Sequence, residues 1–273
     1  MLVKFNANTL AAASPFHFSF TDAKTELLDP AIVGTTSILK AIKKFAPGVK
    51  RVVVTSSFVS VLSDATLEDP KHTFKESDWD PVTYEEGLTG DKKTAYRASK
   101  TVAEREAWKF VEEEKPNFDL VTICPPLVFG PPAQLLNSLS SINFSNERFV
   151  GLIQGKWKDE IPVSFGVPYW VDGRDVALAH IAAFEKPAAG GKRFLSIAGK
   201  FSNRDIADIA RKNFPELKDV LPAEDVKGGD YPPVVPAWDS SRATEILGIK
   251  WIDFEKSTVD NIKSLLDAGA HKA

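Results

Sequence analysis

The sequence predicts an α/β fold built around a parallel β-sheet, and three segments carry this prediction. Residues 49–57 (VKRVVVTSS) are apolar at their centre and end in small hydroxyl side chains, which favours a central parallel strand buried on both faces. Residues 118–124 (FDLVTIC) have the same character. Between them, residues 96–113 combine Ala, Glu, Arg and Lys with apolar residues and predict a long helix. A strand, a helix and a second strand in this order are typical of parallel βαβ units.

The elements outside this unit are predicted from local signals. Pro30 is a favourable residue for the first turn of a helix, which is expected to run to about residue 45. Residues 193–198 (RFLSIA) predict a weaker third strand, and residues 171–185 predict a helix. Two or three further helices are expected within residues 202–270, where a loop rich in Gly and Pro separates them.

Charge and composition limit the classes of partner. The 273 residues carry a formal net charge of −3, so neither nucleic acid nor an anionic membrane is an expected partner. No apolar run approaches the length of a membrane span, and the N-terminus lacks the pattern of a secretory signal. Cys124 is the only cysteine, which excludes an intramolecular disulfide and favours a cytoplasmic location. The four histidines have no partners at ligand spacing, so no metal site is expected.

The first pattern with chemical meaning is the pair Tyr96 and Lys100. Residues four apart on a helix share one face. A phenol titrates near pH 10, and an adjacent ammonium favours the phenolate. We therefore expect Lys100 to lower the pKa of Tyr96, so that Tyr96 acts as a general acid or base near neutral pH. The same spacing is also typical of an ordinary solvated helix face.

The second pattern is the run Thr55, Ser56 and Ser57 at the end of the first predicted strand. Open parallel sheets bind their ligands at the carboxyl ends of the strands. A serine there can hydrogen-bond a substrate carbonyl while a tyrosine on the next helix donates a proton. A hydroxyl-rich turn at a strand end is common by itself, but its position one βα unit before Tyr96 and Lys100 favours a catalytic site. The spacing leaves Ser56 and Ser57 as rivals for the role.

These residues and several longer motifs resemble a known family. The motifs are SPF (14–16), GTT (34–36), VKRVVVTSS (49–57), ESDW (76–79), YRASKTVAE (96–104) with Trp108, PPLVFGP (125–131), VDGRDVALAH (171–180) and LGIKW (247–251). Together they resemble the extended short-chain dehydrogenase/reductase superfamily, also described as NAD-dependent epimerases and dehydratases. The match is most similar to its fungal branch of methylglyoxal, aldehyde and ketone reductases, which is related to dihydroflavonol reductase.

The resemblance implies a catalytic role for three residues. Tyr96 would protonate the carbonyl oxygen, Ser57 would orient and polarise that oxygen, and Lys100 would lower the pKa of Tyr96 and bind the ribose hydroxyls of the nicotinamide. The implied cofactor is NADPH, and NAD is not excluded. The further cofactor-binding residues that the resemblance implies are Ser14, Pro15, Pro126, Leu127 and Val128.

The resemblance also implies the architecture, with one departure. We expect a Rossmann-like parallel sheet that lacks its N-terminal strands, together with a smaller C-terminal substrate lobe. The family begins with a strand, a glycine-rich loop and a helix that hold the pyrophosphate, whereas the first glycine here is Gly34 and neither GxGxxG nor GxxGxxG occurs. The partial dinucleotide-binding domain is expected over residues 1–130, with 171–200 returning to it. Residues 131–170 and 201–273 are expected to form the substrate lobe.

Three functions are compatible with these observations. The family function is NADPH-dependent reduction of a small aldehyde or ketone to an alcohol, with turnover doubtful in this N-terminally truncated form. The second is a non-catalytic remnant or interaction protein. The third is a nucleotide-sugar epimerase or dehydratase, which shares the Tyr-Lys pair, although the motifs ESDW, YRASKTVAE and PPLVFGP match the reductases better. The sequence determines neither the substrate nor the oligomeric state.

Overall fold

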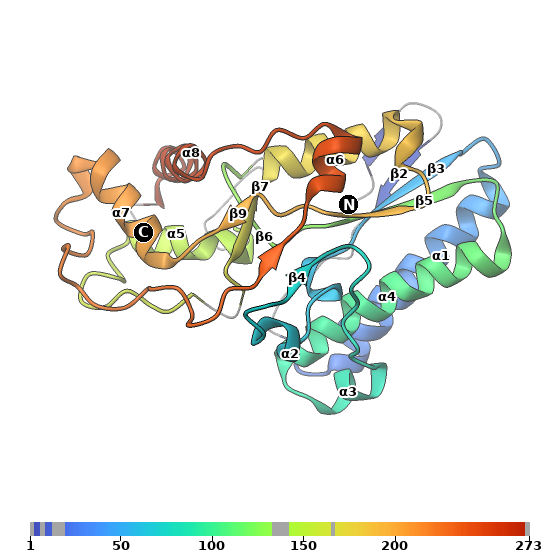
Figure 1. The fold of residues 1–273 in the computed structure, drawn as a ribbon, viewed down its shortest axis with the longest axis horizontal. Coiled ribbons are helices and arrows are strands. Elements are labelled where there is room, and N and C mark those ends of the chain that lie inside the picture. The colour runs from blue at the N-terminus through green and yellow to red at the C-terminus, as the bar shows by residue number, and fades with distance from the viewer. Residues whose placement is uncertain (1–2, 6–8, 13–19, 133–141, 165–166, 271–273) are drawn as a thin grey trace. The chain divides into compact units, whose positions relative to one another are not determined.

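The computed structural model describes residues 3–5, 9–12, 20–132, 142–164 and 167–270. The chain divides into two compact units, each described by itself below (Figure 1). The first unit consists of Met1–Pro125, Leu178–Ser196 and Pro236–Ile249. The second consists of Pro126–Ala177, Ile197–Val235 and Lys250–Ala273.

The first unit contains a five-stranded sheet in the order β1-β2-β3-β5-β8. Its strands are β1 (Val3–Phe5), β2 (Thr9–Ala12), β3 (Arg51–Thr55), β5 (Asp119–Cys124) and β8 (Lys192–Leu195). The last four are parallel, and the sequence predicts three of them, β3, β5 and β8, whereas β1 pairs antiparallel with β2 at the edge. A small parallel pair joins β4 (Thr73–Phe74) to β10 (Ala237–Trp238).

The helices of this unit occupy the predicted positions. The predicted helix from residue 30 is confirmed as α1 (Asp29–Phe45), and the long helix is confirmed as α4 (Lys92–Glu114), which begins four residues before Tyr96. The shorter helices are η1 (Lys24–Leu28), η2 (Phe58–Ser60), α2 (Asp64–Leu67), α3 (Tyr84–Thr89), η5 (Pro187–Ala189) and η7 (Ala243–Leu247). Helix α6 (Gly173–Glu185) begins in the second unit and ends in the first.

The alternation of side chains along β3 explains how the sheet is covered. Val52 and Val54 are buried against Leu39 and Ile42 of α1 and Phe110 of α4, so both helices pack on one face of the sheet (Figure 1). Residues of opposite parity contact the other face. Burial on both faces requires the continuously apolar strand that the sequence shows.

On the opposite face of β3, polar side chains contact α6 and the turn after it. The Thr55 hydroxyl is 2.8 Å from Nε2 of His180. Arg51 donates to the carbonyl oxygens of Ala183 and Lys186, and it also pairs with Asp119 of β5 through Nε at 2.7 Å. These contacts fix the position of the C-terminal half of α6 on the sheet.

The second unit has a three-stranded sheet in the order β6-β7-β9 and its own core. Its elements are β6 (Leu127–Phe129), η4 (Phe144–Asn146), α5 (Glu147–Ile153), β7 (Tyr169–Asp172), β9 (Gly199–Lys200), α7 (Asn203–Asn213), η6 (Pro215–Leu217) and α8 (Phe254–Asp267). Phe129 is buried at its centre, with its ring edge-to-face against Phe149 at 5.1 Å and Phe201 at 4.8 Å.

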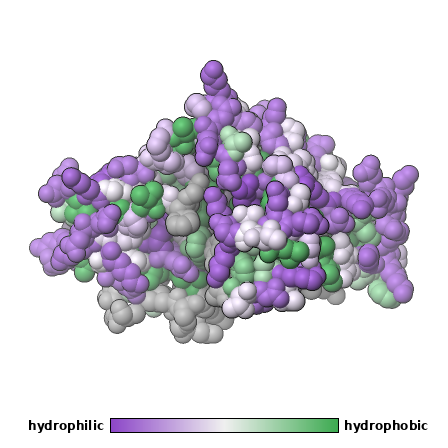
Figure 2. Space-filling view, turned by 90° about the horizontal axis from the view of Figure 1, so that it is seen from below, coloured by the Kyte–Doolittle hydropathy of each residue, from purple (hydrophilic) through white to green (hydrophobic). Residues whose placement is uncertain are grey.

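The surface gives no sign of a membrane span or a metal cluster within the described ranges. Hydrophilic side chains predominate on the face shown in Figure 2, and hydrophobic ones occur there in small separate patches. None of the described helices combines the length and the hydrophobicity needed to cross a bilayer. In the same part of the chain, no group of three or more His, Cys, Asp or Glu side chains is arranged to hold a metal ion.

Candidate active site

Ser57 is held immediately beyond the C-terminal end of β3. The backbone N–H of Ser56 donates to the carbonyl of Ile123 at 2.8 Å, and the N–H of Phe58 donates to Pro125 at 2.8 Å. These bonds continue the pairing of β3 with β5 past the last residue of the strand. Ser57 then caps η2, because its Oγ accepts the N–H of Val59 at 3.3 Å. The serine is therefore fixed at the sheet edge where ligands of parallel sheets bind.

Tyr96 and Lys100 are presented by the first turns of α4. The helix begins at the cap residue Asp91, whose side chain accepts the N–H of Thr94 at 2.7 Å. Tyr96 lies one turn further on and Lys100 one turn after it, and both side chains are half-buried. The Lys100 ammonium is 5.9 Å from the centroid of the Tyr96 ring. The helix thus presents a phenol and an amine from one face, as their spacing predicts.

The structure brings Tyr96 and Ser57 together. Their side chains are hydrogen-bonded, and this bond lowers the pKa of the Tyr96 phenol. Burial acts in the opposite direction and is the larger effect, so the pKa of Tyr96 is raised above its ordinary value. The phenol therefore keeps its proton at neutral pH, which is the state that a proton donor requires.

The expectation that the pKa of Tyr96 is lowered toward neutrality is wrong for this structure. Burial lowers the pKa of the Lys100 ammonium to about 8. The same burial sets the direction of the Tyr96 shift, which is upward rather than toward neutrality. The sequence reveals a charge four residues away, but it does not reveal that both groups lose solvent.

The two candidate serines have different partners. Both serines are 8% exposed, but Ser56 Oγ donates to the Glu104 carboxylate at 2.5 Å. Ser57 Oγ contacts Tyr96 instead. The geometry therefore favours Ser57 as the serine that meets a substrate, and it leaves Ser56 with a structural bond.

Glu104 is the residue that the sequence analysis missed. It lies one turn after Lys100 on α4, is 2% exposed, and accepts hydrogen bonds on both carboxylate oxygens. Burial raises the pKa of its carboxyl, but the charge and hydrogen bonds of Arg193 and the hydroxyls of Ser56 and Ser60 outweigh burial, so the pKa is lowered. Glu104 is the last letter of the motif YRASKTVAE, and its spacing of four from Lys100 was the available signal.

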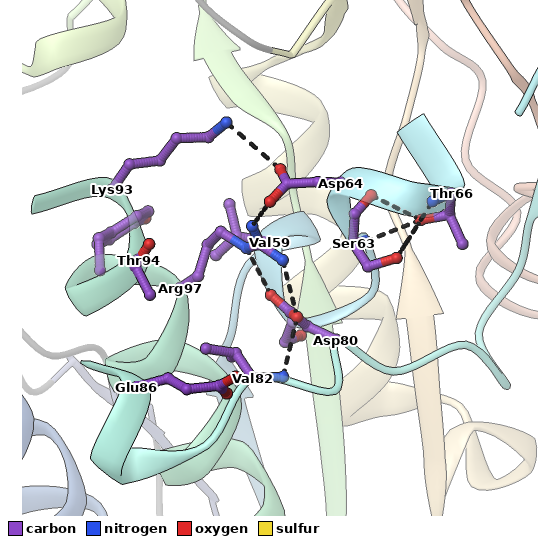
Figure 3. A network of polar contacts seen from close by, with 12 residues as sticks. Val59, Ser63, Asp64, Thr66, Asp80, Val82, Glu86, Lys93, Thr94 and Arg97 are labelled. Carbon is purple, nitrogen blue, oxygen red and sulfur yellow. Dashed lines mark hydrogen bonds and ion pairs between the residues drawn. The ribbon is translucent and has the colours of Figure 1, made fainter. Parts of the chain in front are cut away.

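The motif ESDW belongs to a loop that three arginines fasten to the sheet and to α4. Arg97 holds the buried Asp80 carboxylate with Nε at 2.7 Å and Nη2 at 2.9 Å, and it also reaches Asp64 (Figure 3). Arg105 donates to the carbonyl of Asp80 at 2.7 Å. The Arg193 guanidinium lies 3.6 Å from the Trp79 ring centroid. This loop therefore has a structural explanation and contributes no side chain to the hydrogen-bonded pair of Ser57 and Tyr96 in the part of the chain described.

The remaining predicted residues are distributed as follows. Ser14 and Pro15 lie outside the described residues. Pro126, Leu127 and Val128 belong to the second unit, where Leu127 and Val128 begin β6. The N–H of Val128 donates to Ser145 Oγ at 3.3 Å, and Asn143 donates to the Val128 carbonyl at 3.4 Å. Cys124 is buried, and burial raises the pKa of its thiol to about 12.

Lys100→Met is expected to stabilise the folded chain at pH 7. The pKa of Lys100 is lower in the folded chain, about 8, than the ordinary 10.5, so folding disfavours the charged amine by about 3 kcal/mol at neutral pH. That cost is fully present below pH 8 and disappears as the pH rises from about 8 to 10.5. Urea unfolding at pH 7 and pH 10 measures it. Equal stabilities of variant and parent at pH 7 would contradict the lowered pKa.

Comparisons with known proteins show which proteins the chain is similar to. A family model described as the NAD dependent epimerase/dehydratase family matches residues 7–198. The ketoreductase azaE of Aspergillus niger is 44% identical over 259 residues, covering 93% of this chain and 74% of that protein. A protein of Candida albicans described as a putative NADPH-dependent methylglyoxal reductase is 42% identical over 264 residues, covering 94% of this chain and 75% of its own length.

Solved structures give the same result. The crystal structure of Gre2 from Candida albicans in complex with NADPH superposes with a TM-score of 0.88 at 35% identity. The match covers 97% of this chain and 78% of that protein. The sequence resemblance to fungal reductases and the Rossmann-like fold are both confirmed.

Proposed function

The chain belongs to the NAD dependent epimerase/dehydratase family, and on this premise we propose that it reduces an aldehyde or ketone to an alcohol with NADPH, using Tyr96, Ser57 and Lys100. The observation that carries the proposal is the hydrogen bond between Ser57 and Tyr96 at the C-terminal end of β3. This bond supports the proposal because one carbonyl oxygen, bound beside the two side chains, would accept hydrogen bonds from both hydroxyls.

The residues of the site fit a nicotinamide nucleotide in their chemistry. Lys100 has three donor hydrogens and no acceptor, which suits the two hydroxyls of a ribose. When bound, NADPH supplies the hydride that reduces the carbonyl carbon. Val128 and its neighbours are the candidates for holding the carboxamide, by their position in the motif PPLVFGP.

The proton is supplied by Tyr96. As hydride reaches the carbonyl carbon, negative charge develops on the oxygen, and the hydroxyls of Tyr96 and Ser57 stabilise it by hydrogen bonding. Tyr96 then transfers its proton to this oxygen and becomes a phenolate. A nearby ammonium stabilises that phenolate, and this is the role we assign to Lys100 in the reaction. The raised pKa of the resting phenol keeps Tyr96 protonated until charge develops.

The partner in this proposal is a small molecule with an aldehyde or ketone group. The relatives whose names specify a substrate include methylglyoxal reductases, a ketoreductase and a cinnamoyl-CoA reductase. A cytoplasmic location is part of the same proposal, because the single cysteine is a buried thiol with no second cysteine to pair with.

NADPH is expected to bind these 273 residues weakly. The sequence contains no glycine-rich loop leading into a helix N-terminus, the arrangement that holds a pyrophosphate. Titration calorimetry measures the affinity, with a fusion that adds a strand, a GxxGxxG loop and a helix before residue 1 as the positive control. A dissociation constant in the micromolar range or tighter for the 273 residues alone would contradict the expectation.

The function itself is tested by NADPH oxidation, followed by absorbance, against a panel of aldehydes and ketones. Both forms of the protein are assayed, and the fused form is expected to turn over. If the fused form binds NADPH and reduces no member of a broad panel, the result favours a non-catalytic protein over a reductase.

A further inference from the structure

One face of α4 carries three polar residues in consecutive turns, and the proposed reaction uses only two of them. Tyr96 and Lys100 are half-buried, whereas Glu104, one turn after Lys100, is buried at 2% exposure. A buried carboxylate is costly unless it is paired and hydrogen-bonded. The partners of Glu104 therefore indicate why this charge is present.

The two carboxylate oxygens of Glu104 share Arg193, whose Nη2 also donates to Oε2 at 3.3 Å, and otherwise have different partners. Oε2 accepts the hydroxyls of Ser56 at 2.5 Å and Ser60 at 2.6 Å, both from the turn that follows β3. Oε1 accepts from Thr122 of β5 at 2.7 Å and from Arg193 Nε at 2.8 Å. One oxygen is thus directed at the turn after β3 and the other at the neighbouring strands.

The turn bonded to Oε2 contains Ser57. Ser56 precedes it directly, and the N–H of Ser60 donates to the Ser57 carbonyl at 3.0 Å. The backbone on both sides of Ser57 is therefore tied to a single carboxylate on the helix that carries Tyr96. We infer that Glu104 is a positioning residue, which holds Ser57 Oγ at hydrogen-bonding distance from Tyr96 through Ser56 and Ser60.

This arrangement couples two elements that are distant in the sequence. The bond between Ser57 and Tyr96 requires the turn after β3 to keep a fixed position relative to α4. A shift of about 1 Å in a positioned group is enough to lower a rate about 100-fold. Arg193 keeps the Glu104 pKa low, so the carboxylate stays ionised and accepts both serine hydroxyls at neutral pH. The inference rests on the proposed function for its effect on rate, but the geometry can be tested without turnover.

Ser56→Ala and Thr122→Val form a matched pair of variants. Each removes one hydroxyl that donates to Glu104, and both sites are buried. Only Ser56 adjoins Ser57. A purely structural role for Glu104 predicts similar losses of stability in both variants and no specific change at Tyr96.

The readout is the ¹³Cζ resonance of Tyr96 at pH 7 in the 273-residue chain labelled with ¹³Cζ-tyrosine. The chain has four tyrosines, and Tyr96→Phe assigns the signal. Ser56→Ala is expected to shift this resonance, and Thr122→Val is expected to leave it in place. Ser56→Thr, which keeps the hydroxyl, is expected to restore the parental position. An unchanged resonance in Ser56→Ala, or equal shifts in Ser56→Ala and Thr122→Val, overturns the inference.

The kinetic readout uses the fusion that carries the added strand, GxxGxxG loop and helix before residue 1. Ser56→Ala is expected to lower kcat by about 10- to 100-fold with the KM for NADPH unchanged, while Thr122→Val keeps the parental kcat. If Tyr96→Phe abolishes activity and Ser56→Ala does not lower it, the positioning role is wrong and the proposed function stands. If Tyr96→Phe retains full activity, the proposed function is wrong, and the resonance of Tyr96 still decides the geometry.

Discussion

Tyr96→Phe is expected to lower kcat by about 10²- to 10⁴-fold, the contribution typical of a general acid. The variant removes the phenolic proton that the proposed reaction transfers to the carbonyl oxygen, and it removes the hydrogen bond to Ser57. It keeps the ring, so the packing of α4 and the binding of NADPH should change little. Steady-state NADPH oxidation by the fusion with the added strand, GxxGxxG loop and helix measures kcat. Titration calorimetry measures cofactor affinity separately.

Tyr84→Phe is the matched control. Tyr84 lies on α3, and its hydroxyl donates to Asp29 at 2.6 Å, away from the proposed chemistry. Its loss is expected to leave kcat within about twofold, since a surface substitution of this kind changes little else. Should Tyr96→Phe turn over as fast as its parent, the mechanism proposed for this site is wrong, whatever the fold.

Arg193→Met is expected to destabilise the folded chain by about 3 to 5 kcal/mol at pH 7, the usual cost of leaving one partner of a buried ion pair alone. Arg193 is 7% exposed and pairs with Glu104 at 2.8 Å. It also donates to the carbonyls of Glu76 and Asp78, each at 2.7 Å. Without the guanidinium, the hydroxyls of Ser56 and Ser60 are left to oppose the larger effect of burial, so the pKa of the Glu104 carboxyl is expected to rise.

The loss of stability in Arg193→Met is expected to depend on pH. In the parent, the low Glu104 pKa contributes stability that is present above the ordinary pKa of 4.5 and is lost as the pH falls through the folded value. In Arg193→Met the folded pKa lies above the ordinary one, so the cost is largest at neutral pH and falls toward pH 5. Urea unfolding at both pH values measures the difference.

Two further variants check the interpretation of that result. The double variant Arg193→Met with Glu104→Gln is expected to recover part of the lost stability, because no uncompensated charge remains. Lys43→Met, which removes an exposed pair with Glu114, is expected to cost less than about 1 kcal/mol. A loss in Arg193→Met as small as in Lys43→Met would show that the buried pair contributes little to stability.

The sequence by itself determined the fold class and identified the residues proposed for the site. Continuous apolar runs at residues 49–57 and 118–124 predict strands buried on both faces, since only a sheet covered by helices on each side requires them. The spacing of Tyr96 and Lys100 places both on one helix face, because the helix repeat is fixed. Local periodicity is sufficient to predict buried strands and a shared helix face.

Only the tertiary structure shows the different partners of Ser56 and Ser57 and the direction of the Tyr96 pKa shift. The two serines are adjacent, so only the turn after β3 directs one hydroxyl toward Glu104 and the other toward Tyr96. The pKa depends on how much water each group loses, and this follows from packing between β3, β5 and α4 rather than from spacing along the helix. Glu104 was missed for the same reason, because its partners on β3, β5 and β8 converge on one carboxylate only after the sheet has formed.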